Sequence, residues 1–289
     1  MNTTELALQL LPRRCLEQRC RERLSSAEEL RLRVGQPLSM LLCGREYSMG
    51  GEPITADELL RTLEKATGAS IHTVTPTLQG GFISYHGLRI GVCGTLISCE
   101  GERKSFRHFS SLAVRIPREC RGSCDGVFHR LRQGEGGNVL ILSPPGGGKS
   151  TALRELVRLF SEAGERVGLV DERMEIAAAE DGVPQFSLGP HCDVLSGVPK
   201  AAGAMMLLRA MNPQILAMDE ITRPEDLDAV REIVGCGVKL IATAHAASYE
   251  DLGRRPLYRR LLEERVFSDF VIIKSDGRQR SYTLRREAA

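Results

Sequence analysis

Residues 138–151, which read Asn-Val-Leu-Ile-Leu-Ser-Pro-Pro-Gly-Gly-Gly-Lys-Ser-Thr, limit the possible folds more than any other stretch of the chain. Four apolar residues, Val139 to Leu142, have the length and composition of a buried strand. A turn of prolines and glycines follows, and Lys149-Ser150 then opens a helical pattern. This order is typical of a phosphate-binding loop, G-x-x-x-x-G-K-[ST], with Ser143 in place of the first glycine. The alternative is a flexible glycine turn before an ordinary helix.

The residue types in this loop indicate which atoms would contact phosphate. The two prolines have no N–H group, so the amides that bind phosphate begin at Gly146. Lys149 would reach the β- and γ-phosphates, and the Ser150 hydroxyl would bind Mg²⁺. Because these amides lie downstream of Ser143, we expect an altered loop geometry with binding retained. The predicted nucleotide-binding residues are Ser143, Pro144, Pro145, Gly146, Gly147, Gly148, Lys149, Ser150 and Thr151.

The composition argues against several classes of protein. At 289 residues the chain suits one large domain or two ordinary ones, and a net charge of +2 gives no general preference for nucleic acid. No stretch approaches 18 consecutive apolar residues and no signal peptide is recognisable, so we expect a cytoplasmic protein. The nine cysteines include no CxxC pair, which favours reduced thiols over a disulfide framework or a metal site.

The two halves of the chain differ in pattern. Residues 1–120 combine helical segments with short alternating strands, such as Leu30–Val34, and predict a small α+β N-terminal domain. Residues 121–136 predict a linker that contains a short helix. Residues 137–289 alternate strands with helices, which predicts an α/β domain built on a parallel sheet.

Asp219 and Glu220 follow an apolar strand, Ile215–Met218. Ligands of an open parallel sheet bind at the carboxyl ends of its strands, where the phosphate loop also lies. Asp219 would hold Mg²⁺ through water, and Glu220 would orient the attacking water or accept its proton. The alternative is a solvated strand end. A glutamate beside a metal-binding aspartate is typical of RecA-like ATPases, which have an extra strand between the loop strand and the Asp-Glu strand.

Other polar residues of the second half complete the catalytic candidates, which are Lys149, Glu172, Arg209, Glu220 and His245. His245 ends the strand that begins at Lys239 and would sense the nucleotide state near the γ-phosphate, although a lone histidine is usually structural. Glu172 lies in an acidic run that begins at Asp171 and ends at Glu175. It would position water or metal, although such runs are usually solvated surface. Arg209 would pair with a carboxylate or reach a phosphate.

Two arginines of the N-terminal domain are candidates for a different role. Arg115 and Arg118 lie at the end of the last predicted strand of that domain. Either one would reach a γ-phosphate across a domain or subunit interface, as arginine fingers do in other nucleoside triphosphatases. The simpler interpretation of each is a surface arginine.

Several stretches, taken in order, resemble one family. They are the phosphate loop, then VDERMEI, then DVLSGVPKAAGAMMLLRAMNPQILAMDEI, then ATAHA, together with ELRLRVGQPL and GLRIGVCG in the first half. The chain resembles the stage III sporulation protein AA family, which is related to the secretion and pilus ATPases of type II and type IV systems. The matching positions are Lys149 and Ser150 in the phosphate loop, Asp171, Glu172 and Glu175 in an acidic box, Asp219 and Glu220 in the metal-binding motif, and His245 in a histidine box.

The resemblance implies an N-terminal domain joined to a RecA-like ATPase domain that uses ATP and Mg²⁺. It implies a hexamer with ATP between subunits and a role in endospore formation. There the ATPase would power a channel between mother cell and forespore, acting on an integral membrane component from the cytoplasmic side of the membrane. Two alternatives remain open. One is a nucleic-acid translocating motor, against which the weak net charge argues. The other is a nucleotide-binding scaffold with little hydrolysis.

Overall fold

Four short strands and two long ones form the first sheet of the protein, and β1 (Glu29–Arg33) alternates apolar with charged residues. In the computed structural model, Leu30 and Leu32 are fully buried and lie opposite the buried residues Val114 and Leu112 of the neighbouring strand. All neighbouring strands are antiparallel, and their order is β3-β2-β1-β6-β5-β4. The strands are β1 (Glu29–Arg33), β2 (Ser39–Leu42), β3 (Arg45–Ser48), β4 (Phe82–Tyr85), β5 (Leu88–Ser98) and β6 (Lys104–Arg115).

Helices cover the apolar face of this sheet. Helix α1 (Thr3–Leu10) and helix α3 (Ala56–Ala66) contribute their buried leucines to the same core as β1, β5 and β6. Helix α3 begins at a capping box, in which Thr55 and Glu58 each satisfy a backbone N–H of the other. A short 3₁₀ helix, η1 (Arg13–Leu16), follows α1. This core therefore belongs to the first part of the chain alone.

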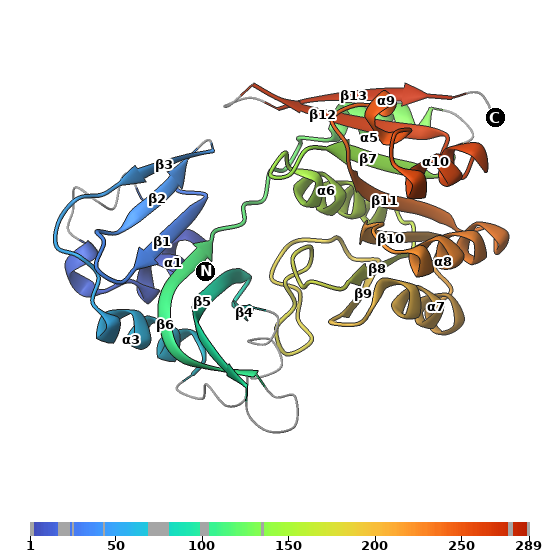
Figure 1. Ribbon diagram of the computed structural model, residues 1–289. Coiled ribbons are helices and arrows are strands. Elements are labelled where there is room, and N and C mark those ends of the chain that lie inside the picture. Colours follow the sequence, from blue (N-terminus) through green and yellow to red (C-terminus); the bar gives the residue numbers. More distant parts are fainter. Residues whose placement is uncertain are drawn as a thin grey trace. The chain divides into compact units, whose positions relative to one another are not determined.

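The chain separates into two compact units, Met1–Arg118 and Glu119–Ala289 (Figure 1). The structure describes residues 3–16, 24, 26–42, 44–68, 81–98, 104–133, 136–276 and 280–287. Much of the stretch predicted as a linker is helical, because α5 (Asp125–Arg132) buries Val127, Phe128 and Leu131 in the core of the second unit. Within the described ranges, no helix has the length and apolar character needed to cross a bilayer.

The second unit is built on a mostly parallel sheet with the strand order β13-β12-β7-β11-β10-β8-β9. Only β13 is antiparallel to its neighbour. As predicted for a RecA-like fold, β11 lies between the loop strand β7 and the Asp-Glu strand β10. The strands are β7 (Val139–Ser143), β8 (Val167–Asp171), β9 (Cys192–Ser196), β10 (Ile215–Glu220), β11 (Lys239–His245), β12 (Asp269–Ser275) and β13 (Arg280–Arg286).

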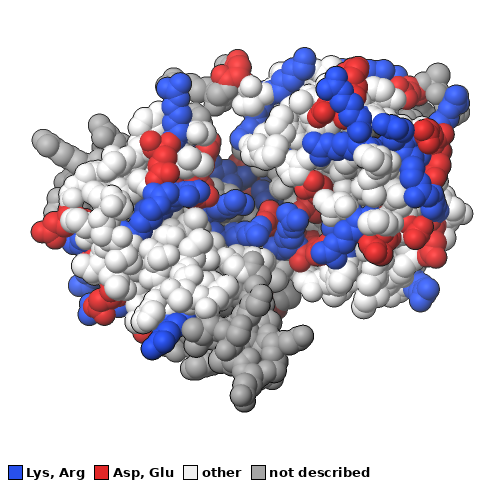
Figure 2. Space-filling view, in the orientation of Figure 1, with Lys and Arg blue, Asp and Glu red and all other residues white. Residues whose placement is uncertain are grey.

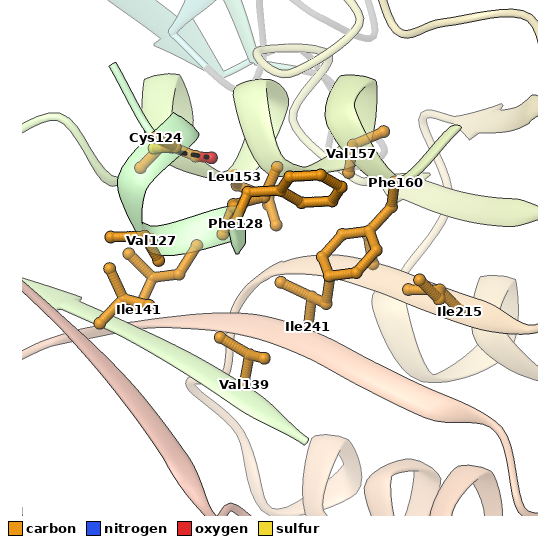
Figure 3. Packing of buried hydrophobic residues seen from close by; sticks show 14 of the residues in the cluster. Cys124, Val127, Phe128, Val139, Ile141, Leu153, Val157, Phe160, Ile215 and Ile241 are labelled. Atoms are coloured by element: carbon orange, nitrogen blue, oxygen red, sulfur yellow. Dashed lines mark hydrogen bonds between the residues drawn. The ribbon is translucent and has the colours of Figure 1, made fainter. Parts of the chain in front are cut away.

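Helices cover both faces of this sheet, which explains why its central strands are apolar on both sides. Helices α5 and α6 (Lys149–Glu162) pack on one face, where the rings of Phe128 and Phe160 meet edge to face with centroids 5.0 Å apart (Figure 3). The helices on the other face are α7 (Lys200–Met211), α8 (Pro224–Gly235), α9 (Tyr249–Leu252) and α10 (Pro256–Glu263).

The charged side chains of the second unit are mixed rather than segregated. On the face shown in Figure 2, lysine and arginine side chains lie beside aspartate and glutamate side chains. Ion pairs between partly or fully exposed side chains of this unit join Arg231 to Glu264 and Arg285 to Glu250. On the visible face of this unit, basic side chains are therefore not separated from acidic ones, whereas a continuous basic stripe is typical of nucleic-acid binding.

Candidate active site

The loop between β7 and α6 owes its shape to its glycines. Gly146 and Gly148 have backbone φ angles of +72° and +100°, which residues other than glycine rarely adopt. Gly148 is also the residue that caps α6, so the free N–H groups of the first helical turn point back toward the loop. A helix N-terminus of this kind favours a bound anion.

Ser143 fills the inside of this loop. The serine is fully buried, and its hydroxyl donates a hydrogen bond to the carbonyl oxygen of Pro144 over 2.8 Å. A Cβ atom on Gly147 would lie only 2.2 Å from the Ser143 Oγ atom. The serine side chain therefore occupies space that the usual glycine leaves free, and Gly147 compensates by having no side chain.

Lys149 is 7% exposed and points back into the loop. Its Nζ atom donates hydrogen bonds to the carbonyl oxygens of Ser143 and Pro144, at 3.3 and 3.4 Å, and lies 2.6 Å from Nδ1 of His245. Burial lowers the pKa of Lys149, although the negative charges of Glu220 and Asp219 oppose this effect. The lysine therefore has a strong preference for an anion beside it.

His245 connects Lys149 to Glu220. Strand pairing places His245 opposite Ser143, at the edge of the sheet where the loop begins. Its Nε2 atom lies 2.8 Å from Oε2 of Glu220. Burial and the charge of Lys149 lower the pKa of His245, so the ring is neutral near pH 7. With the Lys149 ammonium donating to Nδ1, the proton of the ring sits on Nε2 and is donated to Glu220.

A β-bulge sets the directions of Asp219 and Glu220. The pairing of β10 with β11 shifts between Met218 and Glu220, so Asp219 is the extra residue. Bulges re-aim side chains and are frequent beside active sites. Here Asp219 accepts a hydrogen bond from Thr243 over 3.3 Å, while Glu220 contacts His245. Two successive carboxylates therefore contact two residues of β11 that share one face of the sheet.

Asp171 is a structural member of the acidic run. Its carboxylate is fully buried and accepts hydrogen bonds from the backbone N–H groups of Glu175, Ile176 and Ala177. Burial raises the pKa of Asp171, although these hydrogen bonds oppose the effect. Asp171 thus fixes the loop that follows β8, and Glu175 lies in that loop with its backbone carbonyl accepting from Arg154.

Glu172 is held by a buried lysine. The Nζ atom of Lys200 lies 2.6 Å from Glu172 and 3.9 Å from Asp226, and the lysine side chain is only 5% exposed. Burial acts to raise the pKa of Glu172, but the hydrogen bond and charge of Lys200 outweigh it and lower the pKa. The ion pair ties the end of β8 to the first turn of α7.

Of the three predicted arginines, one belongs to the second unit and two belong to the first unit. Arg209 is exposed in the last turn of α7, and this turn lies at the edge where the strands begin, opposite the loop. Arg115 belongs to the first unit, where it lies 3.3 Å from Glu29, and Arg118 donates to the backbone oxygen of Ala27. Thr151, a predicted loop residue, lines a small cavity along α6 with Arg154 and Arg158.

Sequence reasoning missed two residues that shape the site. Thr243 lies two positions before His245 on β11, so strand alternation alone places both on one face. The second is Lys200, which no local sequence signal pairs with Glu172. The positive charge of Arg255, at the start of α10, also lowers the pKa values of Lys149 and His245, after the larger effect of burial.

The fold and the site together define a RecA-like protein, and its loop between β7 and α6 has the sequence pattern of a phosphate-binding loop. The sequence profile of the family described as "Sporulation stage III, protein AA" matches residues 3–283, and the chain belongs to this family. It is 36% identical over 250 residues to Stage III sporulation protein AA of Bacillus subtilis (strain 168). The aligned region covers 84% of this chain and 81% of that protein.

Solved structures show the same fold. The Legionella pneumophila ATPase DotB has a TM-score of 0.63 and 17% identity, and the match covers 91% of this chain and 77% of that one. The pilus retraction motor PilT with bound ADP has a TM-score of 0.61 and 14% identity, covering 95% of this chain and 83% of that one. At sequence identities this low, the similarity to these two structures shows a shared fold and nothing further.

Proposed function

We propose that the chain is a Mg²⁺-dependent ATPase of the secretion type that acts in endospore formation. The observation that carries the proposal is the hydrogen-bonded series from Lys149 through His245 to Glu220 beside the phosphate-binding loop. It joins a group that would neutralise phosphate charge to a group that would activate water. Membership of the sporulation family and the fold shared with an ATPase and a pilus motor support the same assignment.

The residues at the loop fit Mg²⁺. Ser150 and Asp219 offer oxygen ligands, and Mg²⁺ commonly takes one or two protein ligands beside substrate phosphates. Asp219 is 7% exposed, and within the described part of the chain it forms no direct ion pair, although its charge acts on Lys149. A buried carboxylate with no cation in direct contact is costly, and a bound cation would relieve this cost. When bound, Mg²⁺ would neutralise negative charge on the phosphate oxygens.

Lys149 would exchange partners when a nucleotide binds. A phosphate oxygen is a stronger acceptor for the ammonium group than a neutral imidazole or a peptide carbonyl, because the hydrogen bond joins opposite charges. Once Lys149 turns to phosphate, Nδ1 of His245 loses its donor. His245 would then be free to turn, and Glu220 would be released to orient the attacking water and accept its proton.

The acidic run would support this site indirectly. Asp171 would hold the loop after β8 in shape through its backbone hydrogen bonds. Glu172 would keep α7 in place through Lys200 and so act as a positioning residue. Arg209, at the opposite edge of the sheet, would have no role in the nucleotide site of its own chain.

The proposed working form is a hexamer with ATP between subunits, located at the cytoplasmic side of the membrane. Arg115 or Arg118 would be supplied to the nucleotide by a neighbouring subunit. Hydrolysis would swing the N-terminal domain, residues 1–120, against the RecA-like domain, residues 137–289. This motion would pull on an integral membrane component of the mother cell–forespore channel.

Equilibrium binding of ATP to the wild-type chain and to Lys149→Ala tests the proposal. We expect the substitution to weaken binding by at least about tenfold, because a charged hydrogen bond contributes about 1.5 to 3 kcal/mol. The mass of the same sample, measured with and without ATP, should show a hexamer with ATP. Equal affinity in the two proteins would refute the nucleotide site, and circular dichroism controls for the fold of the variant.

A further inference from the structure

Arg280 lies against the phosphate-binding loop. It is the first residue of β13 and pairs with Ser275, the last residue of β12, at the edge of the sheet where β7 also ends. A Cβ atom on Gly148 would meet Nε, Cδ and Cζ of Arg280 at 3.1, 3.3 and 3.4 Å. The guanidinium group therefore covers the residue that caps α6.

This placement is electrostatically unfavourable without an anion. A cation at a helix N-terminus opposes the helix dipole. Lys149, next to Gly148, adds a second positive charge. The two other arginines of β13 have acidic partners: Arg285 pairs with Glu250 and Glu287, and Arg286 pairs with Asp269. Among the residues that the structure describes, no carboxylate pairs with Arg280.

The strand order places Arg280 on the far side of the loop from the hydrolytic residues. In the sheet order β13-β12-β7-β11-β10, the loop strand β7 separates β12 and β13 from β11 and β10, which carry His245 and Glu220. A nucleotide in the loop would therefore have Glu220 on one flank and Arg280 on the other. A group on the flank away from the attacking water contacts the part of the nucleotide that ATP and ADP share.

We infer that Arg280 is a nucleotide-binding residue supplied by the chain's own C-terminal hairpin, which holds the phosphates common to ATP and ADP. The inference rests on the proposed function. It differs from the arginines of the first unit, which would act on a neighbouring subunit's γ-phosphate. Arg280 strengthens binding of both nucleotides and leaves the hydrolytic step to Glu220 and Lys149.

Binding of ADP and of a non-hydrolysable ATP analogue to the full chain, in buffer with Mg²⁺, tests the inference. Arg280→Gln should raise both Kd values by about tenfold, the lower end of the range for a lost charged hydrogen bond. The two Kd values of Arg280→Lys should lie between those of the wild type and those of Arg280→Gln. The matched control is Arg166→Gln, which removes the same charge from an exposed arginine just before β8, at the opposite edge of the sheet. This control should bind like the wild type.

Three binding results would overturn the inference. They are unchanged Kd values in Arg280→Gln, a loss confined to the triphosphate analogue, or an equal loss in Arg166→Gln. A kcat at saturating ATP that falls more than about threefold in Arg280→Gln would also contradict it, because a hydrolytic arginine changes rates by far more. If the wild-type chain binds neither nucleotide, the proposed function itself fails. If the wild type binds both and Arg280→Gln binds equally well, only the inference fails.

Discussion

Gly147→Ala should destabilise the second unit, and Ser143→Gly should remove most of that effect. The backbone of Gly147 does not have a positive φ, so alanine is conformationally allowed there. The obstacle is the serine, whose Oγ and Cβ atoms would lie 2.2 and 3.0 Å from the new Cβ atom. In a Ser143→Gly background both of these serine atoms are absent, and the Pro144 carbonyl oxygen remains at 3.0 Å.

The size of the effect follows from two terms. To avoid the new methyl group, Ser143 must rotate and lose its hydrogen bond to Pro144, which contributes about 1 kcal/mol. Its Cβ atom stays close, and overpacking of this kind typically costs about 1 to 3 kcal/mol. We therefore expect Gly147→Ala to lower the free energy of unfolding by about 2 kcal/mol in the wild-type background. The expected loss in the Ser143→Gly background is below about 1 kcal/mol.

Urea unfolding followed by circular dichroism measures these values, since the chain contains no tryptophan for fluorescence. The control is Gly146→Ala, because Gly146 has a positive φ and no atom lies within 4 Å of its added Cβ atom. The free energy of unfolding that Gly146→Ala loses comes from backbone strain, so the loss should be the same in both backgrounds. Equal losses for Gly147→Ala with and without Ser143→Gly would refute the packing described for the loop.

Two further predictions concern ion pairs. Lys200→Met should lower the free energy of unfolding by about 1 to 3 kcal/mol, because it leaves the Glu172 carboxylate without its cation. The pKa of that carboxyl, followed by NMR, should rise; an unchanged pKa would contradict the pairing. In the first unit, the hydrogen bond from Arg14 lowers the pKa of Glu58 to about 2. A lowered pKa means that the pair stabilises the fold above about pH 4.5 and that this contribution, about 1 kcal/mol after solvent screening, is lost as pH falls toward 2. Glu58→Gln should remove this part of the acid sensitivity, and an identical pH profile in both proteins would refute it.

The sequence was most informative where local pattern and topology agree. An apolar strand, a glycine turn and a helix define the loop, and the carboxyl ends of parallel strands must meet at one edge. This reasoning placed Lys149, Asp219, Glu220 and His245 together, and the adjacent Asp-Glu pair predicted the strand inserted between β7 and β10.

Sequence reasoning failed where side-chain direction depends on tertiary structure. No local signal marks the bulge at Asp219, so the contact between Glu220 and His245 could not be foreseen. Arg209 precedes Asp219 closely in the chain, but α7 runs back along the sheet and carries the arginine to the other edge. Arg280 lies far from the loop in sequence and reaches it only through the pairing of β12, β13 and β7.

The most direct test of the central claim is the rate of phosphate release from ATP by the wild-type chain and by Glu220→Gln. Both proteins should be compared at ATP concentrations that give equal nucleotide occupancy. We predict that Glu220→Gln still binds ATP and that its phosphate release falls by at least about a hundredfold, the loss expected when a general base is removed. Equal rates of phosphate release in the two proteins would contradict the role of Glu220 and the hydrolytic site built around it.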